Sequence, residues 1–249
     1  MREAPVGWQC ASCVTQGARI SPTVRPLRRA PGRLGSTRMT PVVAVLILVN
    51  AGVYIWELTN LDNVLRRFEM WPFAVHYYHQ YYRLITAAFL HASFWHIAFN
   101  MASLAIIGPP IEAELGEARF VSIYFLSALG GSTASYLISN PNLGGVGASG
   151  AIFGLMGAYF VLARRRRWDM SAITFLVVGN LILSFTDQAI DWRAHLGGLI
   201  VGAVVCLGLV SGADDPNPTS STLRQVAVVV GMGALLVVLV QLPPGHVNL

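Results

Sequence analysis

The residue best suited to chemistry is Ser149, which stands between glycines at the start of an apolar run. The segment before it, 140–146, is rich in residues that break helices, whereas 151–163 carries no charge. A serine in the first turn of a helix is often only an N-cap, because its oxygen accepts a backbone N–H. The alternative is a nucleophile, which a serine becomes when a neighbouring base removes its proton.

Three polar residues in other apolar segments favour the nucleophile. His195 opens a later apolar run, and the pKa of histidine near neutrality suits a general base. His96 and Asn100 are four residues apart and therefore share one helix face. Together with the backbone N–H of Ser149 they could donate hydrogen bonds to the oxyanion of acyl transfer. No Asp or Glu stands out as a buried third member, so the sequence predicts a Ser–His dyad.

Small residues follow both members of the dyad. Gly150 and Gly154 form one GxxxG pattern, and Gly198 and Gly202 form another. Such faces let two helix backbones approach closely in lipid, so their packing would bring the serine and the histidine together. Phe153, one turn after the serine, could stack on the histidine ring or be an ordinary core aromatic.

The composition indicates an all-α membrane protein. Of 249 residues, 54% are hydrophobic and 12% are charged, about half the charged share of a soluble domain. Seven apolar spans are expected, at 41–58, 84–107, 118–138, 149–163, 170–186, 194–211 and 223–242. A spanning helix needs about 20 residues, so the short fourth and fifth spans suit central helices.

The basic residues, all of them arginine, indicate topology and not nucleic-acid binding. The segment 164–167 is four consecutive arginines, and the tail 1–39 is arginine-rich. With seven spans, both lie on one side, which the positive-inside rule makes the cytoplasm. Ser149, His96 and His195 then lie near the outer face of the cell membrane. The aromatic loop 60–82 would form an interfacial hairpin there.

Three regions follow from this pattern. Residues 1–39 are expected to be a disordered cytoplasmic tail, 40–211 a six-helix catalytic core, and 212–249 a linker, a seventh helix and a short outer tail. Cys10 and Cys13 have the spacing of half a zinc site, but the tail offers no second pair of ligands. An upstream start codon could supply the missing half. No cofactor is expected.

Three motifs in order carry a family resemblance. They are His91-xxxx-His96-xxx-Asn100, Gly147-Ala148-Ser149-Gly150 and Ala194-His195-xx-Gly198-xxx-Gly202. Over residues 40–242 the chain resembles the rhomboid intramembrane serine proteases. The resemblance implies a six-helix core with one extra C-terminal helix, Ser149 as nucleophile and His195 as base. It also implies an oxyanion hole formed by the side chains of His96 and Asn100 and the backbone of Gly147.

Other positions match the family in supporting roles. Glu112 resembles the structural acidic residue after the second helix, and Arg83 resembles the arginine that ties the first loop to the core. Phe153 stands where some members have tyrosine, so stacking can persist without a hydroxyl. His91 matches a family histidine with a structural role. The tail resembles the second half of a cysteine-rich N-terminus found in some actinobacterial relatives.

The leading hypothesis is an endopeptidase that cleaves single-span membrane proteins near the outer end of their transmembrane helix. A substrate would enter sideways from the bilayer, past the fifth span and the loop 186–191. One alternative is an inactive relative that escorts membrane clients; inactive relatives often carry proline before the serine, where this chain has Ala148. A transporter or metal site built on His91, His96 and His195 is the third hypothesis. The natural substrate and the oligomeric state stay open.

Overall fold

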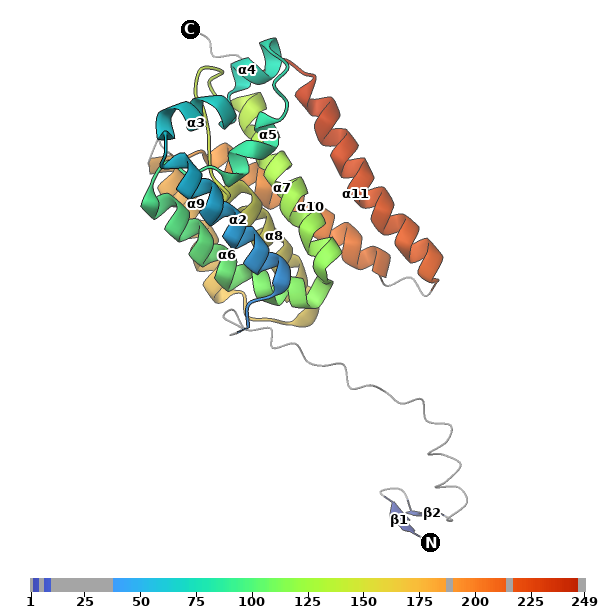
Figure 1. Cartoon of the computed structure of the whole chain (residues 1–249). Helices are drawn as coiled ribbons and strands as arrows, with labels where there is room; N and C mark the ends of the chain where they lie inside the picture. The colour runs from blue at the N-terminus through green and yellow to red at the C-terminus, as the bar shows by residue number, and fades with distance from the viewer. Residues whose placement is uncertain (1, 5–6, 10–37, 187–189, 214–216, 246–249) are drawn as a thin grey trace. The chain divides into compact units, whose positions relative to one another are not determined.

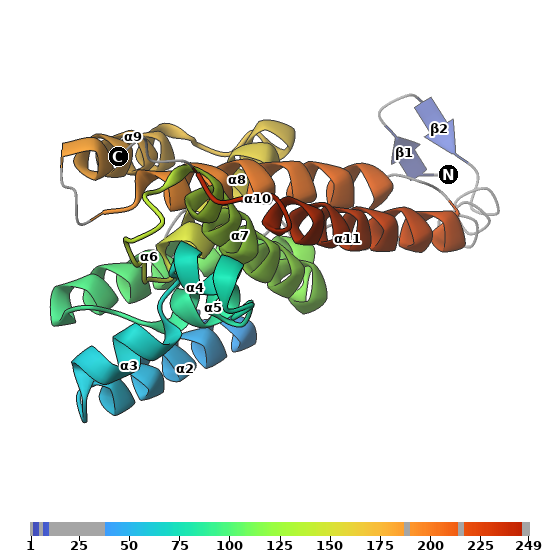
Figure 2. The same cartoon turned by 90° about the horizontal axis from the view of Figure 1, so that it is seen from above.

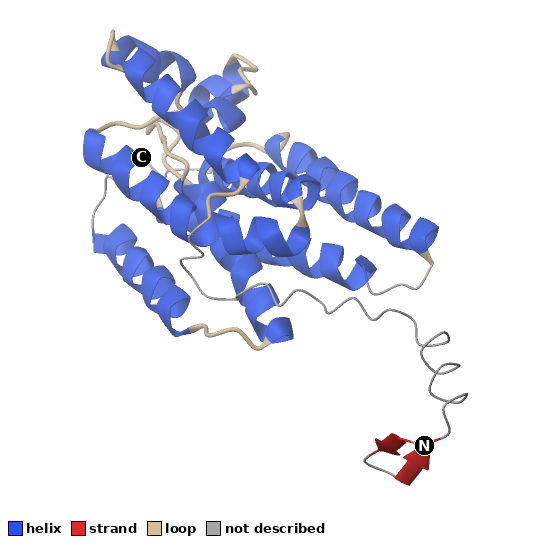
Figure 3. Cartoon of the chain, turned by 60° about the horizontal axis from the view of Figure 1, so that its bottom comes forward, coloured by secondary structure: helices blue, strands red, loops and turns tan. Residues whose placement is uncertain are grey.

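A computed structural model describes residues 2–4, 7–9, 38–186, 190–213 and 217–245. The chain divides into two units, 1–30 and 31–249. In the first unit, β1 (Arg2–Ala4) pairs antiparallel with β2 (Gly7–Gln9), the two strands drawn in red in Figure 3. Cys10 and Cys13 lie outside the described residues, so the half zinc site stays a prediction.

The second unit is a helical bundle (Figure 1). Its elements in chain order are α2 (Pro41–Glu57), α3 (Leu61–Phe68), α4 (Pro72–Tyr77), α5 (Arg83–Thr86), the 3-10 turn η1 (Ala87–Phe89), α6 (Phe94–Leu115), α7 (Glu117–Ile138), α8 (Ser149–Arg166), α9 (Ser171–Thr186), α10 (Trp192–Ala213) and α11 (Pro218–Val240). Among the described residues, α6, α7, α10 and α11 are long and apolar enough to cross a membrane. The apolar helices α2 and α9 are shorter, at 17 and 16 residues, and α8 ends in three arginines. The chain is therefore an integral membrane protein in its composition and architecture, while the count of seven spans stays a prediction.

One expected span differs in the structure. The second span was expected over 84–107, but α6 begins at Phe94, because the side chain of Ser93 accepts a hydrogen bond from the His96 backbone N–H at 3.2 Å. The helix then continues through Pro109 and Pro110. The aromatic loop 60–82 contains the two short helices α3 and α4, and its expected place at the membrane interface stays a prediction.

The helix α8 is the centre of the bundle. Twelve of its 18 residues are buried, although it is short and glycine-rich. It packs mainly against α10, α7 and α6, and Figure 2 shows α7 and α10 running beside it. A helix enclosed by protein does not need the length or apolarity of one that faces lipid, which explains its composition.

Glycines bring α8 and α10 into backbone contact. A Cβ added to Gly154 would lie 3.0 Å from the carbonyl oxygen of Gly198, and one added to Gly198 would overlap the carbonyl oxygen of Gly150. A Cβ on Gly202 would likewise overlap the Gly154 carbonyl oxygen. The two GxxxG faces therefore meet along their length, at a separation that larger side chains do not permit.

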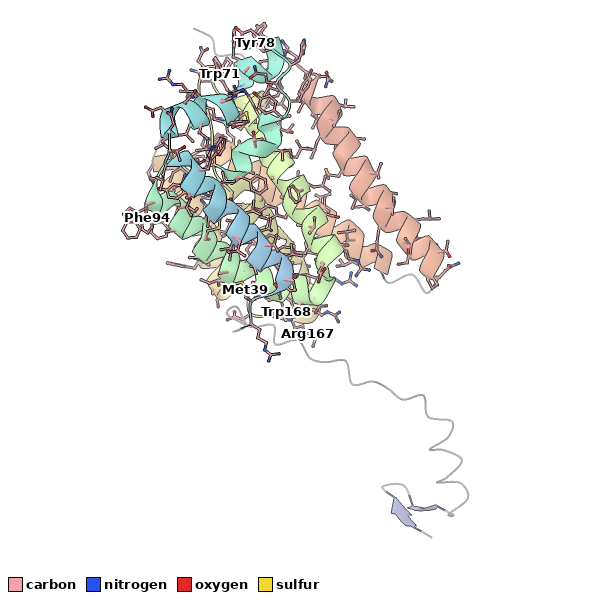
Figure 4. The ribbon with its side chains drawn as sticks, in the orientation of Figure 1. Met39, Trp71, Tyr78, Phe94, Arg167 and Trp168 are labelled. Atoms are coloured by element: carbon pink, nitrogen blue, oxygen red, sulfur yellow. The ribbon has the colours of Figure 1, made fainter. Side chains whose placement is uncertain are left out.

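The two ends of the bundle differ in chemistry. Figure 4 shows Trp71 and Tyr78 at one end, and Met39, Arg167 and Trp168 at the other. Arg167 ends α8 in a left-handed conformation, with a φ of 56°, directly after Arg164–Arg166. The start of α2 and the arginine cluster thus share one end, while Ser149, at the opposite end of α8, is on the aromatic side.

Buried polar contacts fix the helix ends. The carboxylate of Glu112 accepts hydrogen bonds from the Thr40 hydroxyl at 2.6 Å and from the backbone N–H groups of Val42 and Val43 at 3.0 Å each. A carboxylate in this place satisfies the unpaired N–H groups of α2 and complements the helix dipole. Glu112, only 3% exposed, therefore ties α6 to the start of α2.

Arg83 organises the aromatic loop. Its Nη1 donates to the carbonyl oxygen of Glu69 at 2.9 Å, and its Nε donates to Oε1 of Gln80 at 2.6 Å. The planar guanidinium carries its donors in a rigid fork, so it holds both acceptors at fixed positions. The loop in turn pairs with the segment before Ser149, since Met70 and Gly145 exchange two backbone hydrogen bonds of 2.9 Å.

Candidate active site

Ser149 is the first residue of α8, and Ala148 occupies the N-cap position without a side-chain cap. The interpretation of Ser149 as a simple N-cap is therefore wrong, and its hydroxyl is left for another partner. The approach to the helix is a turn at Gly147, whose φ of 127° is a conformation that other residues rarely adopt. This sharp turn presents the serine at the end of the most deeply buried helix.

The hydroxyl of Ser149 meets the imidazole of His195. The distance from Ser149 Oγ to His195 Nε2 is 2.8 Å, a normal hydrogen bond. His195 is 5% exposed, whereas Ser149 is partly exposed. A serine and a histidine 46 residues apart thus form a pair that is shielded on the base side and open on the nucleophile side.

The start of α10 places the imidazole. Oδ1 of Asp191 accepts hydrogen bonds from the backbone N–H groups of Arg193 at 3.0 Å and Ala194 at 3.4 Å. The other carboxylate oxygen accepts a hydrogen bond from the hydroxyl of Ser135 on α7. Asp191 is therefore an N-cap that also anchors the first turn of α10 to a neighbouring helix.

Phe153 supports the imidazole from below. Its ring is stacked on that of His195, with centroids 4.2 Å apart and an angle of 9° between the planes. Phe153 is 2% exposed, so the stack is enclosed in the core. Of the two interpretations of Phe153, stacking on the histidine is the one that matches this geometry.

The second ring nitrogen of His195 has a partner that the sequence did not predict. Ser184 Oγ, on α9, lies 2.8 Å from His195 Nδ1. Ser184 is 3% exposed and lies one turn after Asn180, to whose carbonyl oxygen its hydroxyl donates at 2.6 Å. The only sequence signal was a polar pair four residues apart in an apolar helix. Two buried carboxylates, Glu57 and Glu112, make other contacts.

His96 lies beside the turn that precedes the serine. A Cβ added to Gly147 would be 2.6 Å from His96 Nε2 and 3.7 Å from Ser149 Oγ, so the imidazole edge and the hydroxyl face the same small space. Asn100, 6% exposed, lies one turn further along α6 and donates from Nδ2 to the His96 carbonyl oxygen at 2.9 Å. An amide nitrogen carries two protons, so this bond leaves one for another acceptor.

The expected role of the Gly147 backbone needs a correction. Its N–H donates to the carbonyl oxygen of Ala87 at 2.9 Å, so this proton is already engaged. The N–H of Ser149 is in the first turn of α8, where backbone donors have no partner within the helix. Gly147 thus shapes the turn and makes room for His96, while the N–H of Ser149 is a backbone donor at this turn without a partner inside the helix.

The remaining predicted residues lie outside this cluster. Arg83 and Glu112 make the structural contacts described above. His91 is fully buried, its ring centroid lies 5.1 Å from that of His96, and its backbone N–H donates to Glu57 at 3.1 Å. Among the described residues, no group of three or more His, Cys, Asp or Glu side chains is arranged to hold a metal ion.

Comparison with known proteins places the whole cluster within one matched domain. The profile of the Rhomboid domain matches residues 78–212, more than half of the chain. YdcA of Bacillus subtilis (strain 168) is 32% identical over 176 residues, covering 66% of this chain and 86% of YdcA. Rhomboid protease AarA of Providencia stuartii is 27% identical over 214 residues, covering 71% of this chain and 74% of AarA.

Rhomboid protease GluP of Bacillus subtilis (strain 168) is 36% identical over 160 residues, which cover 61% of this chain but 31% of GluP. The chain thus spans most of the length of YdcA and AarA but under a third of the length of GluP. The matched domain contains Ser149, His195, His96, Asn100 and Ser184. On the domain match and on the similarity to YdcA over most of its length, this chain belongs to the rhomboid family.

Proposed function

We propose that the protein is an intramembrane serine endopeptidase in which Ser149 is the nucleophile and His195 the general base. The observation that carries this proposal is the 2.8 Å contact between Ser149 Oγ and His195 Nε2 at the end of the central helix. A hydroxyl becomes a competent nucleophile when a histidine in hydrogen-bond reach accepts its proton. Membership of a family whose relatives include named proteases supports the same assignment.

The reaction follows from this geometry. His195 Nε2 takes the proton of Ser149 as Oγ attacks the carbonyl carbon of the scissile bond. The resulting imidazolium then gives that proton to the leaving amine as the carbon–nitrogen bond breaks. A water molecule, activated by the same nitrogen, hydrolyses the acyl-enzyme and returns the proton to Ser149. Phe153 keeps the ring in one plane through both transfers, since the stacked geometry resists rotation.

The negative oxygen of the tetrahedral intermediate needs donors, and three groups are suitable. These are His96 Nε2, the second amide proton of Asn100 and the backbone N–H of Ser149. The close approach of His96 to Gly147 supports the first, since it places the ring edge next to the space in front of the hydroxyl. Each such donor typically contributes about 10²- to 10³-fold to turnover.

The substrates we propose are single-span membrane proteins cut near the outer end of their helix. The aromatic end of the bundle carries Ser149, and the arginine-rich end would face the cytoplasm of a cell membrane. The helix α9 is the proposed gate, because its large apolar side chains face outward: Phe175, Val178, Ile182, Leu183 and Phe185. Residues 187–189 of the adjoining loop lie outside the described residues.

The test is cleavage of a tagged single-span substrate in liposomes. We expect Ser149→Ala and His195→Ala to abolish turnover, and Ser122→Ala to leave it unchanged. Ser122 is a partly exposed serine of α7 whose hydroxyl donates to the carbonyl oxygen of Ala118 in its own helix at 2.8 Å. A fluorophosphonate probe should label the unaltered protein and the Ser122 variant but not the Ser149 variant.

Cleavage that survives Ser149→Ala would refute the proposal. Binding of the substrate without any cleavage or labelling by the unaltered protein would favour the alternative of an inactive escort.

A further inference from the structure

The hydrogen bond between Ser184 and His195 is unlike the other hydroxyl contacts of α9. Thr174 and Ser184 both donate to the backbone carbonyl four residues earlier, at 2.7 Å to Met170 and 2.6 Å to Asn180. Serine and threonine in helices commonly make this bond, which by itself has no functional meaning. Ser184 differs because its oxygen also lies 2.8 Å from His195 Nδ1, in a place that is buried from solvent.

The number of protons available to this contact determines which ring nitrogen of His195 is protonated. A serine hydroxyl has one proton and two lone pairs. The proton of Ser184 is committed to the carbonyl oxygen of Asn180, which can only accept. The Ser184 oxygen therefore accepts from His195, so that Nδ1 carries the hydrogen. In a neutral imidazole Nε2 is then bare, as it must be to receive the proton of Ser149.

The opposite arrangement would disable the base. If Ser184 donated to Nδ1, the proton of the neutral ring would reside on Nε2 and point at the Ser149 oxygen. The nitrogen next to the nucleophile would then have no lone pair for its proton. Serine proteases in general use a third group, often a carboxylate, to hold the correct tautomer and orientation of the histidine. Among the described residues, no carboxylate contacts His195 Nδ1. Its partner is the hydroxyl of Ser184, which donates its own proton to the Asn180 carbonyl oxygen.

We propose that Ser184 is a positioning residue that holds His195 in its Nδ1–H tautomer. Ser149, His195, Ser184 and the Asn180 carbonyl then form one chain of hydrogen bonds. This inference rests on the proposed roles of Ser149 and His195. Ser184 touches neither the substrate nor the attacked bond and acts only through the imidazole. Its action requires an oxygen that accepts from Nδ1 while its own proton is held elsewhere, which threonine can also provide.

The kinetic test compares three variants in the liposome cleavage assay. Ser184→Ala removes the acceptor and should lower kcat about tenfold or more, with KM changed less than twofold. Ser184→Thr keeps a hydroxyl able to bond the same carbonyl and should retain activity within about threefold of the unaltered protein. Thr174→Ala removes the same type of back-bond from the same helix, far from His195, and should have no effect.

The tautomer can be measured directly, first in the protein with Ser184 in place. We would label the histidines with 15N, assign His195 by its disappearance in His195→Gln, and read the ring nitrogen shifts in detergent at neutral pH. The proposal predicts a protonated Nδ1 and an unprotonated Nε2 in the unaltered protein. In Ser184→Ala the two tautomers should mix.

The outcomes separate this inference from the proposed function. Full kcat in Ser184→Ala would overturn the role of Ser184 and leave the roles of Ser149 and His195 intact. A protonated Nε2 in the neutral ring of the unaltered protein would overturn the role of Ser184 and would also contradict the assignment of His195 Nε2 as the base. A failure of Ser184→Thr to restore activity, in a protein that melts at the normal temperature, would also overturn the role of Ser184. Cleavage by Ser149→Ala would instead remove the proposed function itself.

Discussion

The contact between α8 and α10 offers a sharp test of how far the site tolerates displacement. In Gly198→Ala, the new Cβ would overlap the carbonyl oxygen of Gly150 and lie 2.7 Å from its carbonyl carbon. Ordinary contact begins at 3.4 Å, so the carbon contact alone requires the backbones to separate by about 0.7 Å, and the overlap with the oxygen requires more. If the displacement reaches the ends of the helices, the 2.8 Å contact between Ser149 and His195 lengthens to at least about 3.5 Å, beyond the usual hydrogen-bond range.

We therefore expect Gly198→Ala to lower kcat by about 10²-fold, the typical effect of misplacing a catalytic group by about 1 Å. Overpacking should also lower the free energy of unfolding by about 1–3 kcal/mol. The assay is substrate cleavage in liposomes, with thermal unfolding measured on the same preparations. The matched control is Gly231→Ala on α11, where nothing lies within 4 Å of the added Cβ.

Retention of more than half of the activity by a folded Gly198→Ala variant would refute the reasoning, because it would mean that the two helices are not held at this separation. Loss of activity in Gly231→Ala would show that any added methyl group in this bundle is disruptive. The effect of Gly198→Ala could then not be attributed to the contact between α8 and α10.

Two further predictions concern neighbours of the site. Phe153→Leu should lower kcat about two- to tenfold, because aromatic stacking contributes roughly 0.5–1.5 kcal/mol, whereas Phe153→Tyr should keep full turnover in the same assay. Glu112→Gln should lower the free energy of unfolding by about 1–3 kcal/mol, since a buried charged acceptor of three hydrogen bonds is lost. Labelling of Ser149 by a fluorophosphonate at low temperature should be unchanged in Glu112→Gln, and a loss there would contradict a purely structural role.

Local sequence patterns predicted much of the candidate site and part of the fold. The motif around Ser149 predicted a serine at the start of an apolar helix, and α8 begins at that residue. The end of α9 at Thr186 and of α7 at Ile138 also agree with the apolar spans, because polar or helix-breaking residues follow both. These features depend on residues close in sequence, which is why a single chain reveals them.

The errors arose where tertiary contacts override local composition. The apolar residues from 84 onward look continuous with α6, yet they form α5 and η1 because Ser93 caps a new helix at Phe94. The second span was expected to end at 107, but α6 continues through the buried Pro109 and Pro110 to Leu115. Ser184 looked like any self-bonded serine of a membrane helix, since its partner lies 11 residues away on α10.

The unequal lengths of the outer helices have a consequence for the surrounding lipid. At 1.5 Å per residue, α2 and α9 are about 25 Å long and α11 is about 35 Å long, against a hydrocarbon core of about 30 Å. Figures 1 and 2 show α11 on one flank of the bundle and α2 and α9 away from it. Such mismatches are accommodated by a tilt of the helix or by a local change of bilayer thickness, with thinning beside α2 and α9 and thickening beside α11. A transmembrane segment whose length fits the bulk bilayer is too long where the bilayer is thinned beside α9. This mismatch lowers the free-energy cost of moving that segment from lipid into the protein.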